Sequence, residues 1–184
     1  MRYLLLPLLV LSSCRQEKNT AEEAQSNEPT IVRLESERPL MGTLFKIITY
    51  AKDPREGYLA MEKSFDLAED FSNRATDYDP DSELNRLTKS KPGMPIAVSK
   101  ELFDVLILGK KLTRKSEGIF DPTLGPLTHL WRETRRTKEV PSEEDIAAAR
   151  SRCGIEFLAF DEKKQTITVK RQGLQLDLGG IAKG

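Results

Sequence analysis

A carboxylate and an amine flank a pair of glycines in the last stretch of the 184-residue chain, residues 174–184. Before the glycines, leucines alternate with Gln175 and Asp177, which is the period-two pattern of a half-buried strand. The glycines carry no Cβ atoms, so the backbone N–H and C=O groups there can approach a ligand closely. Because Lys183 follows on the expected first turn of a helix, the stretch is suited to bind a nucleotide or a metal-bound phosphate.

Two further segments carry groups that could contact a ligand. Residues 119–127 contain two prolines and a glycine, which force an irregular path and leave backbone polar groups in need of partners. A ligand can supply those partners, and a merely structural loop explains the segment equally well. Tyr78 lies on a loop expected between two helices, where an aromatic side chain more often packs than binds. For Met41, Asp177 and Lys183 the structural alternatives are a core position, a helix cap and a solvated surface charge.

Composition excludes several other chemistries. The chain has 29 Lys and Arg residues and 29 Asp and Glu residues, so its formal net charge is zero and no basic field favours nucleic-acid binding. His129 is the only histidine, so a histidine base must be His129 or lie beyond Gly184. The two cysteines, Cys14 and Cys153, suggest neither a disulfide framework nor a zinc site. We expect Cys153 to be a small core residue at a helix end.

The N-terminus has the pattern of a bacterial lipoprotein signal. An apolar run over residues 4–11 is too short to span a bilayer and fits the core of a signal peptide, which we place at residues 1–13. It ends in Leu-Ser-Ser-Cys, which resembles a lipobox, so Cys14 is the predicted lipidation site where an acyl chain such as palmitate would anchor the protein. The alternative is a buried N-terminal helix with an incidental cysteine. Residues 14–30 are polar and aperiodic, which predicts a flexible tether.

The remaining residues, 31–184, are expected to form a folded domain. Hairpins and helices without regular βαβ alternation favour an α+β fold, with a mixed sheet and packed helices. The first predicted helix is capped by Asp53. Its core face is expected to carry Tyr58, Met61, Phe65 and Ala68. The other expected elements are a strand over residues 44–50, a short helix with Leu84 and Leu87, a helix from Ser99 to near Gly118, a helix from Ser142 to Arg152, a hairpin over residues 155–170 and a strand over residues 174–178.

Four stretches of the chain, in this order and at this spacing, resemble the ApbE family. They are residues 41–43 (Met-Gly-Thr), 78–84 (Tyr-Asp-Pro-Asp-Ser-Glu-Leu), 120–127 (Phe-Asp-Pro-Thr-Leu-Gly-Pro-Leu) with Leu130–Trp131, and 176–184 (Leu-Asp-Leu-Gly-Gly-Ile-Ala-Lys-Gly). Each motif alone is weak, but together, behind a lipobox, they are strong. The resemblance covers the chain from about Met41 to Gly184 and implies an ApbE-like fold.

Members of this family are FAD:protein FMN transferases, bacterial lipoproteins that face the periplasm. The resemblance implies a magnesium-dependent reaction in which FAD, the substrate, is cut at its pyrophosphate, FMN passes to a Ser or Thr hydroxyl of an acceptor protein, and AMP leaves. The implied partners are flavin-acceptor proteins and, through Cys14, a membrane. We expect the inner membrane, although Arg15 after the cysteine is not a retention signal and the outer membrane stays open.

The resemblance also implies a role for each residue that matches a family motif. For FAD, it implies that Met41 packs on the flavin and that Tyr78 stacks against or hydrogen-bonds part of the molecule. Ile119, Phe120 and Asp121 would line the ligand through backbone and carboxylate contacts. Asp177 would bind the adenosine part, and Lys183 would bind FAD. The role for the metal falls on Gly180, whose backbone carbonyl would bind Mg²⁺, a cation that takes oxygen ligands.

Part of the family's site is missing from these motifs. The remaining metal ligands, an Asp and a Thr, and a histidine-containing motif are expected beyond Gly184, as are the catalytic residues. We do not assign the base role to His129. The resemblance therefore predicts a chain that is incomplete at its C-terminus, holds part of a metal site and is inactive alone. The alternative functions are a periplasmic lipoprotein that binds FAD, or hydrolyses it to FMN and AMP without transfer, and a non-catalytic assembly lipoprotein.

Overall fold

Two antiparallel strands open the part of the chain that the computed structural model describes, residues 30–183. β1 (Val32–Leu40) pairs with β2 (Thr43–Ala51). Met41 and Gly42, which join the strands, have φ angles of 50° and 70°. A type I′ hairpin turn requires positive φ at both of its central residues. β2 confirms the strand predicted over residues 44–50, whereas the sequence patterns did not indicate β1.

Residues 1–29 and 184 lie outside the described part of the chain. The predicted signal peptide, Cys14 and nearly all of the predicted tether fall among them. From Ile31 onwards the chain forms one compact unit. Within the described residues, no helix combines the length and the apolar character that crossing a bilayer requires.

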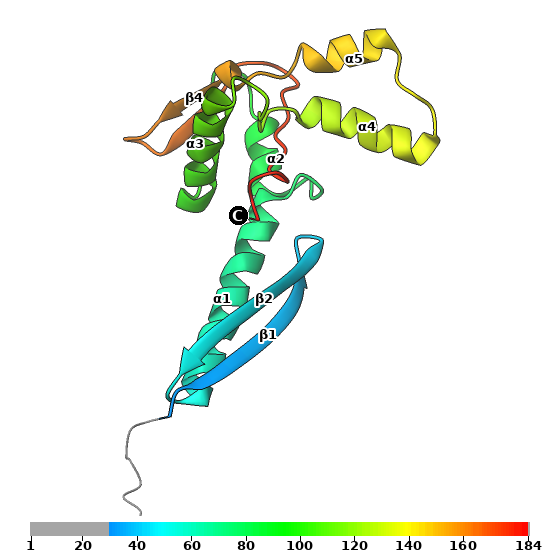
Figure 1. The fold of residues 1–184 in the computed structure, drawn as a ribbon. Coiled ribbons are helices and arrows are strands. Elements are labelled where there is room, and N and C mark those ends of the chain that lie inside the picture. The colour runs from blue at the N-terminus through cyan, green and yellow to red at the C-terminus, as the bar shows by residue number, and fades with distance from the viewer. Residues whose placement is uncertain (1–29, 184) are drawn as a thin grey trace, which may run out of the picture. The chain divides into compact units, whose positions relative to one another are not determined.

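Helix α1 (Pro54–Ala75) follows the hairpin and packs against it (Figure 1). The side chain of Asp53 accepts a hydrogen bond from the amide of Arg55 at 2.8 Å, which confirms the predicted cap. Pro54 occupies the first turn, where its missing N–H has no helical partner to lose.

One stripe of α1 is buried, and it differs from the predicted one at its N-terminal end. Met61 and Phe65 are buried as expected, but Tyr58 is exposed and its predicted core position was wrong. The stripe runs through Gly57 instead, where a Cβ atom would lie 2.3 Å from Cδ1 of Leu34 in β1. A larger residue there would displace the side chain of Leu34, because side chains of the hairpin, Leu34 and Ala51, pack directly over the helix at this point.

The remaining elements form a second sheet with helices packed around it. They are α2 (Glu83–Thr88), β3 (Pro95–Ala97), α3 (Lys100–Lys115), α4 (Gly125–Thr137), α5 (Glu143–Arg150), a 3₁₀ turn (Ile155–Phe157), β4 (Leu158–Asp161) and β5 (Thr166–Val169). The sheet is antiparallel with the order β3-β5-β4. Helices packed with antiparallel sheets confirm the α+β class. Ser99 and Ser142 cap α3 and α5 as predicted.

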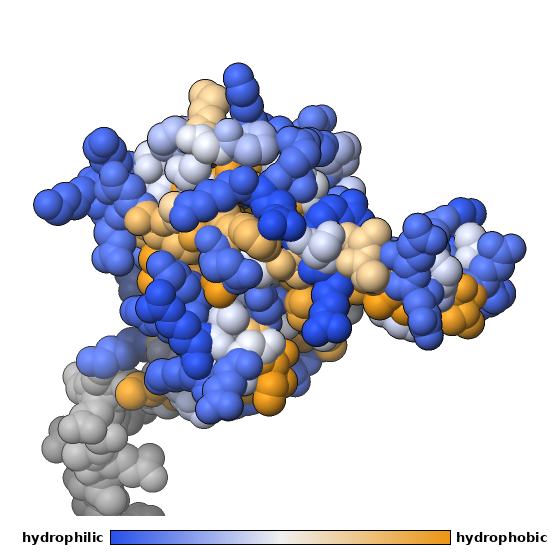
Figure 2. Space-filling model, turned by 90° about the horizontal axis from the view of Figure 1, so that it is seen from above, coloured by the Kyte–Doolittle hydropathy of each residue, from blue (hydrophilic) through white to orange (hydrophobic). Residues whose placement is uncertain are grey.

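The hydrophobic core joins α2, α3 and the three-stranded sheet to the last segment of the chain. Its members that are at most 2% exposed are Leu84, Leu87, Leu102, Leu106, Ile167, Val169, Leu174, Leu176 and Leu178. Hydrophobic residues also reach the surface, where they interrupt the hydrophilic side chains on the face shown in Figure 2. Large exposed ones include Ile119, Trp131 and Val140.

The last segment is not the strand that its alternating sequence predicted. Residues 174–178 belong to no helix or strand, but the side-chain alternation is as expected, with three leucines buried and Gln175 and Asp177 partly exposed. Their backbone, however, pairs with a loop: Gln175 forms an isolated parallel bridge with Leu124. The expected helix opening after the glycines is a series of hydrogen-bonded turns, in which the amides of Ile181 and Ala182 donate to the carbonyl oxygen of Leu178.

Candidate functional site

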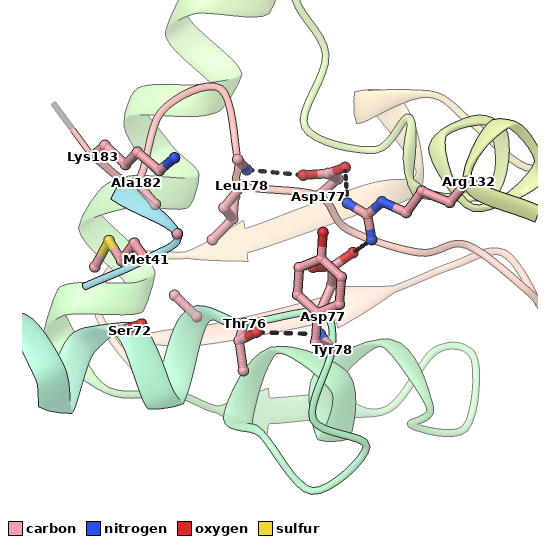
Figure 3. Close-up of a pocket in the computed structure, with 13 residues that line it drawn as sticks. Met41, Ser72, Thr76, Asp77, Tyr78, Arg132, Asp177, Leu178, Ala182 and Lys183 are labelled. Carbon is pink, nitrogen blue, oxygen red and sulfur yellow. Dashed lines mark hydrogen bonds and ion pairs between the residues drawn. The ribbon is translucent and has the colours of Figure 1, made fainter. Parts of the chain in front are cut away.

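Four parts of the chain surround a pocket of about 560 Å³ (Figure 3). They are the β1–β2 turn, the C-terminal end of α1 with the loop after it, helix α4, and residues 177–183. This volume is typical of a small-molecule site. The lining residues are Met41, Gly42, Ser72, Ala75, Thr76, Asp77, Tyr78, Arg132, Asp177, Leu178, Gly179, Ala182 and Lys183.

Four residues singled out from the sequence line this pocket together, although they lie far apart in the chain. They are Met41, Tyr78, Asp177 and Lys183. Met41 and Lys183 lie on one side of the view in Figure 3, and Tyr78 and Asp177 lie on the other. A thioether, a phenol ring, a carboxylate and an ammonium group therefore surround one cavity. This set can contact a ligand that has both an aromatic ring and a phosphate.

Arg132 of α4 connects the two acidic residues of the pocket. Its Nη1 atom donates to Oδ2 of Asp77, and its Nη2 atom donates to Oδ2 of Asp177 at 2.9 Å. The side chains of Arg132, Asp77 and Asp177 are 26%, 8% and 16% exposed, so this bridge is largely sheltered from water. Burial opposes the charge of Arg132, but the hydrogen bond to Asp77 and the charges of both carboxylates raise its pKa above the ordinary value.

The ring of Tyr78 stacks on the same guanidinium group. The Cζ atom of Arg132 lies 4.6 Å from the ring centroid, which is a cation–π contact. The amide of Tyr78 also donates to the hydroxyl of Thr76 at 3.2 Å. Tyr78 is still 77% exposed. The ring can therefore present its remaining surface to a planar group in the pocket.

Asp77 has a second partner in His129, which lies on the same helix as Arg132. The Nε2 atom of His129 is 3.1 Å from Oδ2 of Asp77. His129 is itself absent from the pocket lining. It therefore contacts the carboxylate of Asp77 without lining the pocket, and together with Arg132 it fixes the position of that carboxylate.

The backbone of Asp177 is tied to the loop that precedes α4. Its amide donates to the carbonyl oxygen of Pro122 at 2.8 Å. The side chain adds a local contact, because Oδ1 of Asp177 accepts a hydrogen bond from the amide of Gly179 at 2.8 Å. The two oxygens of this carboxylate thus have different partners, one in the glycine turn and one in α4.

The predicted residues 119–121 do not line the pocket. Ile119 is 88% exposed. The Oδ1 atom of Asp121 accepts from the amide and the hydroxyl of Thr123, at 2.8 and 2.7 Å. The ring of Phe120 packs beside Gly180, where a Cβ atom would lie 3.3 Å from it. These residues shape the loop around the pocket, and their contacts with FAD stay a prediction.

The described residues offer no cluster of ligating side chains for a metal ion. Among residues 30–183, no group of three His, Cys, Asp or Glu side chains gathers closely enough to hold a metal ion. Gly180 is exposed, next to the pocket residue Gly179. Its predicted role as a carbonyl ligand of Mg²⁺ is not tested by this geometry.

Sequence reasoning missed Asp77 and Arg132, which the pocket brings together. It did not predict α4, because Gly125 and Pro126 looked like helix breakers. A proline is nevertheless compatible with the first turn of a helix, and here it lies at that position. Had the helix been expected, the i, i+3 spacing of His129 and Arg132 would have placed both side chains on one face.

Comparisons with known proteins identify similar chains. The family model described as the ApbE family matches residues 41–184. The FAD:protein FMN transferase of Vibrio cholerae is 30% identical over 183 residues, which cover 98% of this chain and 50% of that protein. The FAD:protein FMN transferase of Chlamydia muridarum is 32% identical over 124 residues, which cover 67% of this chain and 38% of that protein.

Solved structures agree with these matches. The flavin transferase ApbE from Vibrio cholerae superposes with a TM-score of 0.73 at 28% identity, over 84% of this chain and 50% of that one. The ApbE protein from Thermotoga maritima superposes with a TM-score of 0.71 at 27% identity, over 83% of this chain and 49% of that one. The chain thus spans about half the length of the relatives it matches, or less.

Proposed function

The chain belongs to the ApbE family, and from this premise we propose that the protein is an FAD:protein FMN transferase. It would cut FAD at the pyrophosphate, transfer FMN to a Ser or Thr hydroxyl of an acceptor protein and release AMP. The observation that carries this proposal is the convergence of Met41, Tyr78, Asp177 and Lys183, from distant parts of the chain, on one pocket. The acceptor proteins are the partners that such a reaction requires.

The pocket residues supply binding and orientation. The thioether of Met41 and the ring of Tyr78 offer surfaces for the planar rings of FAD. The carboxylate of Asp177 can accept hydrogen bonds from the adenosine part, and the ammonium of Lys183 can pair with a phosphate oxygen. The pocket carries two carboxylates, Asp77 and Asp177, and two cations, Arg132 and Lys183. Its own charges therefore cancel, and they leave the negative charge of a pyrophosphate uncompensated.

Magnesium dependence is part of the proposal, although no group of three His, Cys, Asp or Glu side chains that could hold a metal ion is found among residues 30–183. Within this chain, the carbonyl oxygen of Gly180 would hold the metal ion. In relatives that are about twice as long, the remaining ligands have room outside the matched region.

Membrane attachment is the second part of the proposal and is supported by the sequence alone. The Leu-Ser-Ser-Cys pattern and the apolar run before it favour a lipidated Cys14. The protein would then act on the periplasmic side of a bacterial membrane, with the inner membrane as the expected one.

The decisive experiment incubates the complete protein, with any residues that follow Gly184, with FAD, Mg²⁺ and an acceptor domain. Flavin fluorescence that stays on the denatured acceptor supports transfer. Free FMN without labelled acceptor supports hydrolysis of FAD instead. If FAD neither binds the protein nor protects it against unfolding, the non-catalytic alternative is favoured. A Tyr78→Leu variant serves as the comparison, because loss of the ring should weaken FAD binding while the exposed position spares the fold.

A further inference from the structure

We infer that Arg132 is a positioning residue, which holds Tyr78 and Asp177 in the arrangement that accepts the dinucleotide. The inference rests on the proposed function, because it assigns Arg132 a part in binding FAD at the same pocket. Neither the predicted roles nor the family motifs assign a function to this residue.

One side chain connects three parts of the pocket wall. Arg132 comes from α4, Asp77 and Tyr78 come from the loop after α1, and Asp177 comes from the terminal segment. The two acidic partners lie 55 and 45 residues away from Arg132 in the sequence. In Figure 3 the guanidinium points between the two carboxylates, with the ring of Tyr78 beside it.

The guanidinium is suited to this task and an ammonium is not. Its planar fork directs Nη1 to Asp77 and Nη2 to Asp177, while its face covers the ring of Tyr78 at 4.6 Å. A lysine is a point charge, which can neither bridge two carboxylates in this way nor stack on a ring with the same geometry. Lysine at this position would keep the positive charge but would not hold Asp77, Asp177 and Tyr78 in place.

Arg132 acts through other residues and not as the main anchor of the ligand. Both of its Nη atoms already donate to carboxylates, so its charge is compensated before FAD arrives. The neighbouring carboxylates would repel each other without it, since Asp77 and Asp177 share it as a common partner. His129, 3.1 Å from Asp77, steadies only one end of this arrangement.

The test compares FAD binding by the full chain and by three variants, with flavin fluorescence as the readout. Arg132→Gln removes the charge and the fork, Arg132→Lys keeps the charge alone, and Arg135→Gln removes an exposed arginine of the same helix as a control. We expect both Arg132 variants to raise the Kd for FAD by about tenfold or more and the control to leave it unchanged. Circular dichroism and thermal unfolding establish that each variant is folded.

A double-mutant cycle with Tyr78→Leu separates positioning from general stability. If Arg132 acts through Tyr78, Arg132→Gln loses part of its effect on FAD binding once the ring is gone, and a second cycle with Asp177→Asn tests the other partner in the same way. Fully additive losses in both cycles would overturn the inference, because Arg132 would then act through neither neighbour. Wild-type affinity in Arg132→Lys would also overturn it, since charge alone would be sufficient.

Nuclear magnetic resonance of the free protein keeps this inference separable from the proposed function. The Nη protons of Arg132 should give distinct resonances, because two different carboxylates hold them, and the ring signals of Tyr78 should shift in Arg132→Gln. If the complete wild-type protein binds no FAD, the proposed function fails and these signals alone decide whether Arg132 holds its neighbours. Averaged Nη signals, like those expected for Arg135, would overturn the inference in either case.

Discussion

The amide of Asp177 donates a hydrogen bond to the carbonyl oxygen of Pro122 at 2.8 Å. This bond joins two of the motifs that carry the family resemblance, the Phe-Asp-Pro-Thr-Leu-Gly-Pro-Leu loop and the Leu-Asp-Leu-Gly-Gly segment. A parallel bridge between Leu124 and Gln175 continues the pairing. The loop therefore fixes the position of the Asp177 backbone at the pocket, although the loop residues themselves do not line the pocket.

The close approach of these two segments predicts a strong effect of Gly125→Ala. A Cβ atom at Gly125 would lie 2.6 Å from the carbonyl carbon and oxygen of Gln175, so the backbones would have to separate. We expect a loss of about 1–3 kcal/mol in the free energy of unfolding, as for overpacking in a core. Chemical denaturation measures it, with Arg135→Ala on the exposed side of α4 as the control. Wild-type stability of Gly125→Ala would mean that the segments are not in contact.

Hydrogen bonds of Thr123 also stabilise the loop over residues 120–127. It is fully buried, and its hydroxyl donates to Asp121 and accepts from the amide of Gly154 at 2.7 Å. Thr123→Val keeps the shape but leaves that amide without its partner, which costs about 1–3 kcal/mol. Urea unfolding should show the loss. Thr134→Val is the matched control, since its hydroxyl only bonds a carbonyl of its own helix and its removal should change stability little.

Local chemistry explains which parts of the fold could be predicted. Asp53, Ser99 and Ser142 cap their helices because each side chain needs only backbone amides two or three residues away. The bridge made by Arg132 joins residues 55 and 45 positions apart, and no pattern within one segment indicates such a bond. Alternation over residues 174–178 correctly indicated which side chains are buried. It could not indicate that a loop, and not a strand, pairs with their backbone.

The half-buried thiol of Cys153 leads us to predict that the free energy of unfolding depends on pH. Burial raises the pKa of its thiol, so the folded chain holds this proton more tightly than the unfolded chain does. The stability that follows from this shift is fully present below the pKa of the unfolded thiol and is lost as the pH rises through the folded value. In a Cys14→Ser variant, Cys153 is the only thiol left. We expect iodoacetamide to modify it more slowly near pH 8 than after unfolding in urea. Equal rates in the two states would contradict a sheltered thiol.

Two substitutions of Asp177 should separate its binding role from its structural one. Asp177→Asn keeps an oxygen that can accept from the amide of Gly179 and removes the charge that pairs with Arg132. We expect the fold to persist and the affinity for FAD to fall by about tenfold, the effect of losing one charge-assisted hydrogen bond. Asp177→Ala also releases the glycine turn, so it should lower the melting temperature as well.

The control for Asp177→Asn is a carboxylate whose loss should not change FAD binding. Asp66, on the exposed side of α1, makes only a surface ion pair with Arg38 at 3.8 Å, and such pairs contribute little. Asp66→Asn should therefore bind FAD as the wild type does, in titrations followed by flavin fluorescence. If Asp177→Asn also retains the wild-type affinity, the acid before the glycines serves the backbone turn alone. The ligand would then contact the pocket from the side of Met41 and Lys183.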